Sequence, residues 1–74
     1  MTFHVVRKND AQIHVMHAEG HEYTFTVAET DDGVRHLGEP LIHESGYGKH
    51  SGAHFSAEAR RFAENEARTS KLID

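Results

Sequence analysis

The sequence predicts an α+β domain in which a three- to four-stranded antiparallel β-meander is covered on one face by a single C-terminal α-helix. Apolar residues alternate with polar ones at the two-residue period of half-buried strands over the first 37 residues. They return at helical spacing after residue 55, beyond a long segment rich in glycine and histidine. Because 74 residues are few, we expect one domain, 1–74, with the sheet at 2–37, a loop at 38–55 and the helix at 56–72.

Three strands are expected at residues 2–7, 11–17 and 21–29. The third has the clearest pattern, because Tyr23, Phe25 and Val27 alternate with polar residues and are aromatic or β-branched. Both connections are short enough for hairpins, and Gly20 suits the left-handed position that ends a three-residue loop. The turn signal Thr-Asp-Asp-Gly then precedes a possible fourth strand at 34–37.

The helix is expected to begin after Ser56, a residue type that often caps helices, and to end near Leu72. Its apolar positions form a narrow stripe rich in alanine, and small side chains let a helix approach a sheet closely. We therefore expect the helix to lie across the apolar surface of the strands. The stripe consists of Ala59, Phe62, Ala63 and Ala67.

The apolar faces of the strands also predict their pairing. Slipping a strand by one residue would turn its apolar side chains to the other face, so only alternate registers are allowed. Three-residue loops then select one register for each hairpin. The predicted neighbours are Val5 and Ile13, Phe3 and Val15, His4 and His14, Val15 and Tyr23, and His17 and His21.

Composition and charge argue against several classes of protein. The formal charge is −4, and the eight basic residues are scattered, so no dense basic stripe for a nucleic-acid backbone is present. There is no cysteine, and no apolar run is long enough to cross a membrane. The start MTFHVVRKND lacks the apolar core of a signal peptide, so we expect a cytoplasmic chain that does not contact a membrane.

Histidine is the compositional anomaly, with eight residues that all precede the expected helix. Directly opposed strand residues have Cβ atoms about 4.5 to 5.5 Å apart, so two imidazoles can share one divalent ion. The two predicted pairs therefore make His4, His14, His17 and His21 candidate ligands for zinc or nickel, with Glu19, Glu22 or water completing the shell. Alternatively, full protonation of all eight would change the formal charge from −4 to +4 and make the chain pH-responsive.

The segment HESGYGKHSGAH, residues 43–54, resembles a phosphate-binding loop because it is rich in glycine and precedes a helix. A Walker A loop fails at His43 and His50, and the dinucleotide-binding pattern fails at Ser51. What remains is a general anion contact, predicted at Lys49, His50 and Ser51, which leaves a weak anion or nucleic-acid binder as an alternative function.

The sheet face away from the helix is expected to be an interaction surface. Val6, Met16 and Thr24 place apolar and polar side chains side by side there, as is typical of protein interfaces. The first strand is also a possible exposed edge for self-association. With no catalytic motif and no cofactor expected, the sequence predicts a small non-enzymatic accessory domain that binds protein through this face and the glycine- and histidine-rich loop.

Overall fold

The computed structural model of the protein describes residues 2–46 and 48–74. These residues form an antiparallel sheet of five strands, one short 3₁₀ helix and one α-helix. The elements are β1 (Phe3–Lys8), β2 (Gln12–His17), β3 (Glu22–Glu29), β4 (Arg35–Leu37), β5 (Leu41–His43), the 3₁₀ helix η1 (Gly52–Phe55) and α1 (Ser56–Thr69). The predicted α+β class, with a meander and one C-terminal helix, is confirmed.

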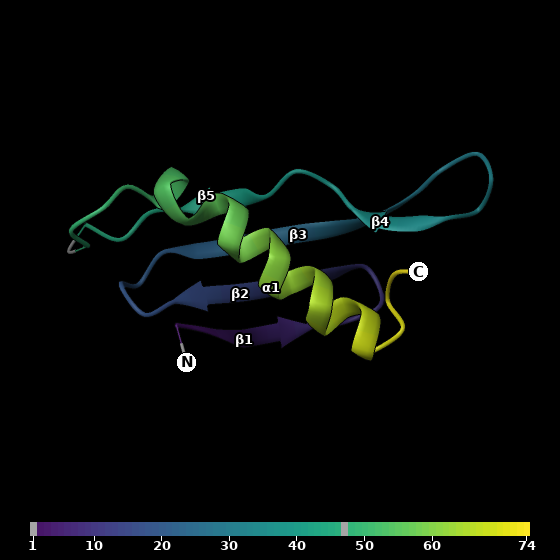
Figure 1. Cartoon of the computed structure of the whole chain (residues 1–74), viewed down its shortest axis with the longest axis horizontal. Coiled ribbons are helices and arrows are strands. Elements are labelled where there is room, and N and C mark those ends of the chain that lie inside the picture. Colours follow the sequence, from purple (N-terminus) through teal and green to yellow (C-terminus); the bar gives the residue numbers. More distant parts are fainter. Residues whose placement is uncertain (1, 47) are drawn as a thin grey trace.

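Strand β3 organises the sheet, whose order is β1-β2-β3-β4 with β5 also paired to β3. The first half of β3 lies between β2 and β5, and its second half pairs with β4. Strands β4 and β5 therefore lie one after the other along the same side of β3, opposite β2 (Figure 1). Strand β1 forms the other edge of the sheet.

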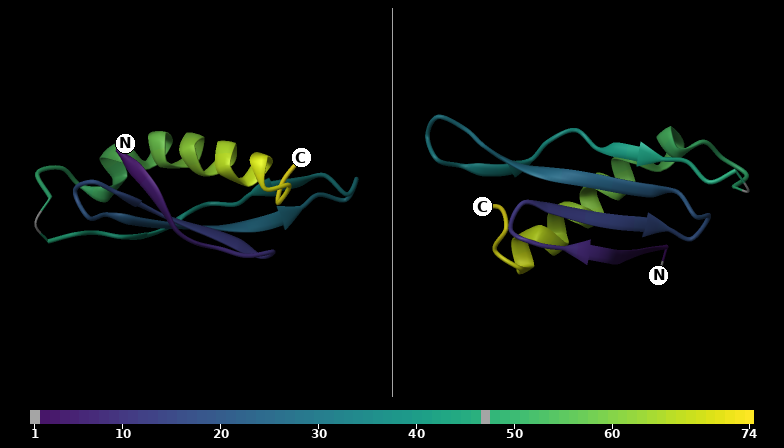
Figure 2. Two further views of the ribbon diagram at one scale, coloured as in Figure 1. Left: turned by 90° about the horizontal axis from the view of Figure 1, so that it is seen from below. Right: turned by 180° about the vertical axis from the view of Figure 1, so that it is seen from behind.

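Helix α1 crosses one face of the sheet diagonally, and no other element covers the opposite face in the described residues (Figures 1 and 2). The core lies between the helix and the sheet, as predicted. Alanine side chains of α1 meet the larger side chains of the strands, which allows the close approach expected of a small-residue stripe. The buried apolar residues are Phe3, Ile13, Val15, Tyr23, Phe25, Leu37, Ala59, Ala63, Ala67 and Ile73.

The ends of α1 differ from the prediction. Ser56 is the first helical residue rather than the cap, and it follows η1 without a side-chain capping bond. The helix ends at Thr69, earlier than expected, because Lys71 takes a left-handed conformation with φ of 63°. The Leu72 amide then donates to the Ala67 carbonyl at 2.8 Å, which closes the helix end in the manner of a Schellman motif.

The hairpin between β2 and β3 has the predicted register. Val15 pairs with Tyr23, and the His17 amide donates to the His21 carbonyl at 2.8 Å. Gly20 has φ of 94° and so occupies the left-handed position that ends the loop, as expected.

The hairpin between β1 and β2 has a different register from the predicted one, because Val5 pairs with Val15 and Phe3 lies opposite His17. Two features cause the shift. The Asn9 side chain accepts hydrogen bonds from the amides of residues 11 and 12 and closes a tighter turn than expected. A β-bulge between Val5 and Arg7 then inserts Val6 as an extra residue, which keeps Val5 on the core side.

Candidate functional site

The face of the sheet away from α1 is the first candidate surface, and we call it the open face. Residues alternate between the two faces along each strand, so the face is defined by the positions between the core residues. The right view of Figure 2 shows the sheet from this side, with the helix behind it. The open face consists of His4, Val6, Arg7, Gln12, His14, Met16, Glu22, Thr24, Thr26, Leu41 and His43.

The pairing of the strands arranges these side chains in rows that cross four strands. In one row, residues of β1, β2, β3 and β5 follow in the order His4, Met16, Glu22 and His43. In the next row the order is Arg7, His14, Thr24 and Leu41, with Val6 beside Arg7 in the bulge. The strand register therefore determines which open-face side chains are neighbours.

The apolar part of the open face lies at its two edges. Val6 on β1 is 46% exposed and Leu41 on β5 is 75% exposed, while Met16 between them is half-buried. The predicted interface residues Val6, Met16 and Thr24 all lie on this face. Leu41 was missed, because no strand was expected in the segment that contains β5.

The charge of the open face is balanced. His14 Nε2 lies 2.8 Å from Glu22 Oε1, so the one carboxylate of the face already has a partner on the neighbouring strand. Arg7 is the one arginine or lysine among the open-face residues, and apart from Glu22 the other titratable side chains there are histidines. The face thus carries little net charge at neutral pH, whereas the whole chain has a formal charge of −4.

Both edges of the sheet carry features that oppose strand-to-strand pairing with another chain. The bulge interrupts the free edge of β1, and Arg7 and Lys8 place charges there. On the other side, β4 and β5 are three residues long each, and Pro40, which has no backbone N–H, lies between them. The open face is therefore a better candidate surface for a partner than either edge.

The predicted histidine pairs have different outcomes. His17 and His21 are direct neighbours, as expected, with ring centroids 6.4 Å apart. The predicted pairing of His4 with His14 is wrong, because the tighter turn places His14 opposite Arg7 and the bulge then places His4 opposite Met16. His4 and His14 lie on the open face, whereas His17 and His21 are buried on the helix side. The structure does not bring the four predicted metal ligands together.

No group of three or more histidine, aspartate or glutamate side chains in the described ranges is arranged to hold a metal ion. The two buried histidines are instead engaged in packing and in hydrogen bonds to the backbone. His17 stacks on Phe55 with ring centroids 3.8 Å apart and contacts Phe3 edge-on at 4.9 Å. Its Nδ1 accepts a hydrogen bond from the Glu19 amide at 2.9 Å.

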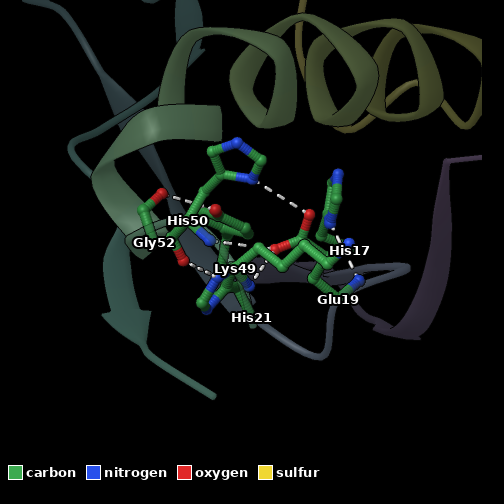
Figure 3. Close-up of polar contacts among 7 residues, drawn as sticks. His17, Glu19, His21, Lys49, His50 and Gly52 are labelled. Atoms are coloured by element: carbon green, nitrogen blue, oxygen red, sulfur yellow. Dashed lines mark hydrogen bonds and ion pairs between the residues drawn. The ribbon is translucent and has the colours of Figure 1, made fainter. Parts of the chain in front are cut away.

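His21 joins the hairpin to the glycine-rich loop, and both its ring nitrogens are occupied (Figure 3). Nδ1 accepts from the Ser45 amide at 3.0 Å. Nε2 lies 2.7 Å from the His50 carbonyl oxygen, which can only accept, so we assign the ring proton to Nε2. A neutral imidazole thus satisfies both loop groups, and a metal ion could replace neither bond without releasing the loop.

Glu19 occupies the predicted anion contact. Its Oε1 accepts from the Lys49 amide at 2.9 Å and from the His50 amide at 3.2 Å, and its Oε2 lies 3.1 Å from His50 Nδ1 (Figure 3). The backbone amides of Lys49 and His50 therefore bind an internal carboxylate. Ser51 follows in an extended conformation immediately before η1 and makes no contact with Glu19 among the hydrogen bonds of the described residues.

Two further side chains hold the start of η1. Tyr23 donates its hydroxyl hydrogen to the Gly52 carbonyl at 2.5 Å, and the Gly52 amide donates to the Glu44 carboxylate. Burial, together with the carboxylates of Glu44, Glu19 and Glu58, raises the pKa of the Tyr23 hydroxyl above its usual value. We call Glu19, His21, Tyr23 and Glu44 the loop clamp, because together they bind backbone groups of Ser45, Lys49, His50 and Gly52.

The pKa of Glu19 gives the clamp a testable pH dependence. Partial desolvation acts to raise this pKa, but hydrogen bonds from the His50 side chain and from the His50 and Lys49 amides outweigh it, so the pKa lies below its usual value. A carboxylate with a lowered folded-state pKa stabilises the fold above its unfolded pKa. That contribution is lost as pH falls through the folded pKa.

We expect the amide ¹⁵N and ¹H shifts of Lys49 and His50 to titrate with a midpoint below the usual range of glutamate. NMR spectra recorded from about pH 7 to about pH 3 measure this midpoint. Glu19→Gln should abolish the step, while Glu39→Gln, at a side chain that is 97% exposed, should leave it unchanged. Shifts that are flat over this range in the native protein would contradict the assigned bonds.

Comparison of the chain with protein-family models, with curated proteins and with solved structures found no match. Among the described residues, no helix has both the length and the apolar character needed to span a bilayer. The residues that the structure describes form no pocket. The open face and the loop clamp are therefore the features from which a function can be argued.

Proposed function

We propose that this chain is a small non-enzymatic protein-binding domain that acts through its open face, and that the occupant of this face is a second copy of the chain. The observation that carries the proposal is the position of Val6 and Leu41 at opposite edges of an uncovered face, 46% and 75% exposed. Exposed apolar side chains among polar neighbours are typical of interface surfaces.

Charge is compatible with a second copy as the occupant and argues against a nucleic acid. Copies that met through acidic surfaces would repel one another, because each has a formal charge of −4. The open face has one arginine and one carboxylate, and that carboxylate is already paired with His14. Two such faces can meet without accumulating like charge. A nucleic acid would require more cations than Arg7 supplies on this face.

The loop takes no part in the proposed surface. Its backbone near Lys49 and His50 binds Glu19, and the His50 carbonyl binds His21, so these groups are occupied within the chain. The clamp supports a structural role for the loop, which is to hold η1 against the hairpin.

The size of the face sets the expected affinity. Strands lie about 4.8 Å apart, so four strands make a face about 20 Å wide. An interface of this width buries less than about 1,200 Å², which is the range of weak and transient complexes. We therefore expect a dissociation constant in the micromolar range, on the order of 10 to 500 μM.

Sedimentation equilibrium from about 10 μM to about 1 mM tests this proposal. We expect Val6→Asp and Leu41→Asp each to weaken self-association at least about tenfold, because a two-fold dimer buries two copies of each substituted carboxylate. Val34→Asp is the matched control, because Val34 is 49% exposed but lies outside the open face in the turn before β4.

A native chain that remains monomeric up to about 1 mM would overturn self-association, because that concentration exceeds the dissociation constants expected for a weak complex. Equal weakening by Val34→Asp would assign the effect to charge alone and would also count against the open face.

A further inference from the structure

The strand register also determines how two open faces can meet. We infer that, in the dimer, the two-fold axis runs parallel to the strands between β2 and β3, so that Val6 of each copy contacts Leu41 of the other. This inference rests on the proposed function, because it specifies the geometry of the same interface.

Two closed face-to-face arrangements are available to a flat pair of sheets. If the two-fold axis runs parallel to the strands, β1 of one copy lies over β5 of the other, and β2 lies over β3. If the axis runs across the strands, each strand lies over its own equivalent in the partner. Both arrangements keep the strands of the two sheets aligned within about 30°, as packed twisted sheets do, so the side chains must decide between them.

The apolar residues agree with the axis parallel to the strands. Val6 and Leu41 lie in the same row, on β1 and β5, which are the outer strands of the open face. That axis exchanges the outer strands and keeps the row, so each Val6 lies over the partner's Leu41. The dimer then gains two equivalent apolar contacts, one at each side of the interface.

Charge argues against the axis across the strands. Placing Val6 over the partner's Val6 would also place Arg7 over the partner's Arg7, because Val6 and Arg7 are adjacent in the bulge. His14 would likewise lie over the partner's His14. The parallel axis instead separates the two arginines by the width of the face, and it places His14 over the partner's Thr24.

The remaining row provides a second, independent pair of neighbours. His4 and His43 are the outer residues of the row that contains Met16 and Glu22, and both are exposed. The parallel axis places His4 over the partner's His43, and Met16 over the partner's Glu22. A cross-link at the histidine positions leaves the Val6 and Leu41 contacts intact.

Cross-linking tests the arrangement directly, because the chain contains no cysteine and each introduced thiol is unique. The variants are Val6→Cys, Leu41→Cys, His4→Cys, His43→Cys and the control Val34→Cys. Each pair is mixed at high concentration, with one member ¹⁵N-labelled so that mass spectrometry separates mixed from self cross-links. A bismaleimide with a spacer of about 8 Å suits sheets packed about 10 Å apart.

We expect the mixtures of V6C with L41C, and of H4C with H43C, to give mixed cross-links at least about fivefold above the self products and above any product with V34C. If the chain dimerises but V6C mainly cross-links to itself, this geometry is overturned, and β1 of one copy lies over β1 of the other. Sedimentation that shows only monomer would instead overturn the proposed function itself. Dimerisation with cross-links mainly through V34C would overturn the open face as the interface.

Discussion

His21→Ala is expected to lower the free energy of unfolding by about 3 kcal/mol, which corresponds to a fall in the melting temperature of about 15 °C for a domain of this size. The His21 side chain is 1% exposed, so its removal leaves a cavity on the helix side of the sheet. It also removes the acceptor of the Ser45 amide and the donor to the His50 carbonyl, each worth about 1 kcal/mol.

Chemical denaturation followed by circular dichroism measures this change. The matched control is His36→Ala, because His36 is exposed on β4 and should change stability by less than about 0.5 kcal/mol. His21→Asn should recover part of the loss, because its side-chain oxygen can accept from the Ser45 amide in place of Nδ1. A loss in His21→Ala no larger than that in the control would contradict the role of His21 in the clamp.

Gly52→Ala is expected to destabilise the fold by about 2 kcal/mol, because a methyl group there has no room. A Cβ atom at this position would lie 2.6 Å from Ile42 Cγ2 and 2.9 Å from Glu44 Cγ. Gly52 is also bonded through its carbonyl to Tyr23 and through its amide to Glu44, so the backbone cannot move away without breaking the clamp.

Gly46→Ala supplies the control within the same loop. A Cβ at Gly46 would meet nothing within 4 Å, so we expect a change in stability of less than about 0.5 kcal/mol, or a small gain from reduced freedom of the unfolded chain. Thermal unfolding of the two variants side by side compares the positions. Equal stability of the two alanine variants would show that close packing at Gly52 is not required.

Much of the fold could be predicted from the sequence because the signals were local. The alternation through Tyr23, Phe25 and Val27 and the left-handed position of Gly20 depend on neighbouring residues, and β3 and its hairpin to β2 are confirmed. The alanine stripe of α1 likewise depends on helical spacing alone. Its three buried alanines face the sheet as expected.

The register of β1 could not be predicted because pairing Val5 with Ile13 or with Val15 places the same apolar side chains on the core side. The choice between them depends on the Asn9 side chain closing the turn and on the bulge at Val6. A bulge adds one residue to one strand and leaves no mark in the apolar alternation. The false pairing of His4 with His14 follows from this single ambiguity.

Strand β5 and the loop clamp were missed for a different reason. Three residues are too few to show a period, and β5 is ordered by pairing with a strand about 20 residues earlier in the chain. The clamp joins Glu19 and His21 to backbone groups of a distant loop. The sequence indicated an anion contact at Lys49, His50 and Ser51, but it could not show that the Lys49 and His50 amides bind the carboxylate of Glu19.

The alanines of α1 have a consequence for the entropy of folding. Ordering a buried long side chain costs up to about 2 kcal/mol in lost rotamer freedom, whereas alanine has no side-chain rotamers to lose. At the helix–sheet interface that loss therefore falls mainly on the strand residues, because α1 contributes the fully buried Ala59, Ala63 and Ala67 and, of its larger apolar side chains, only the partly buried Phe62. A chain of 74 residues with a small core thus buries its helix at little cost in side-chain freedom.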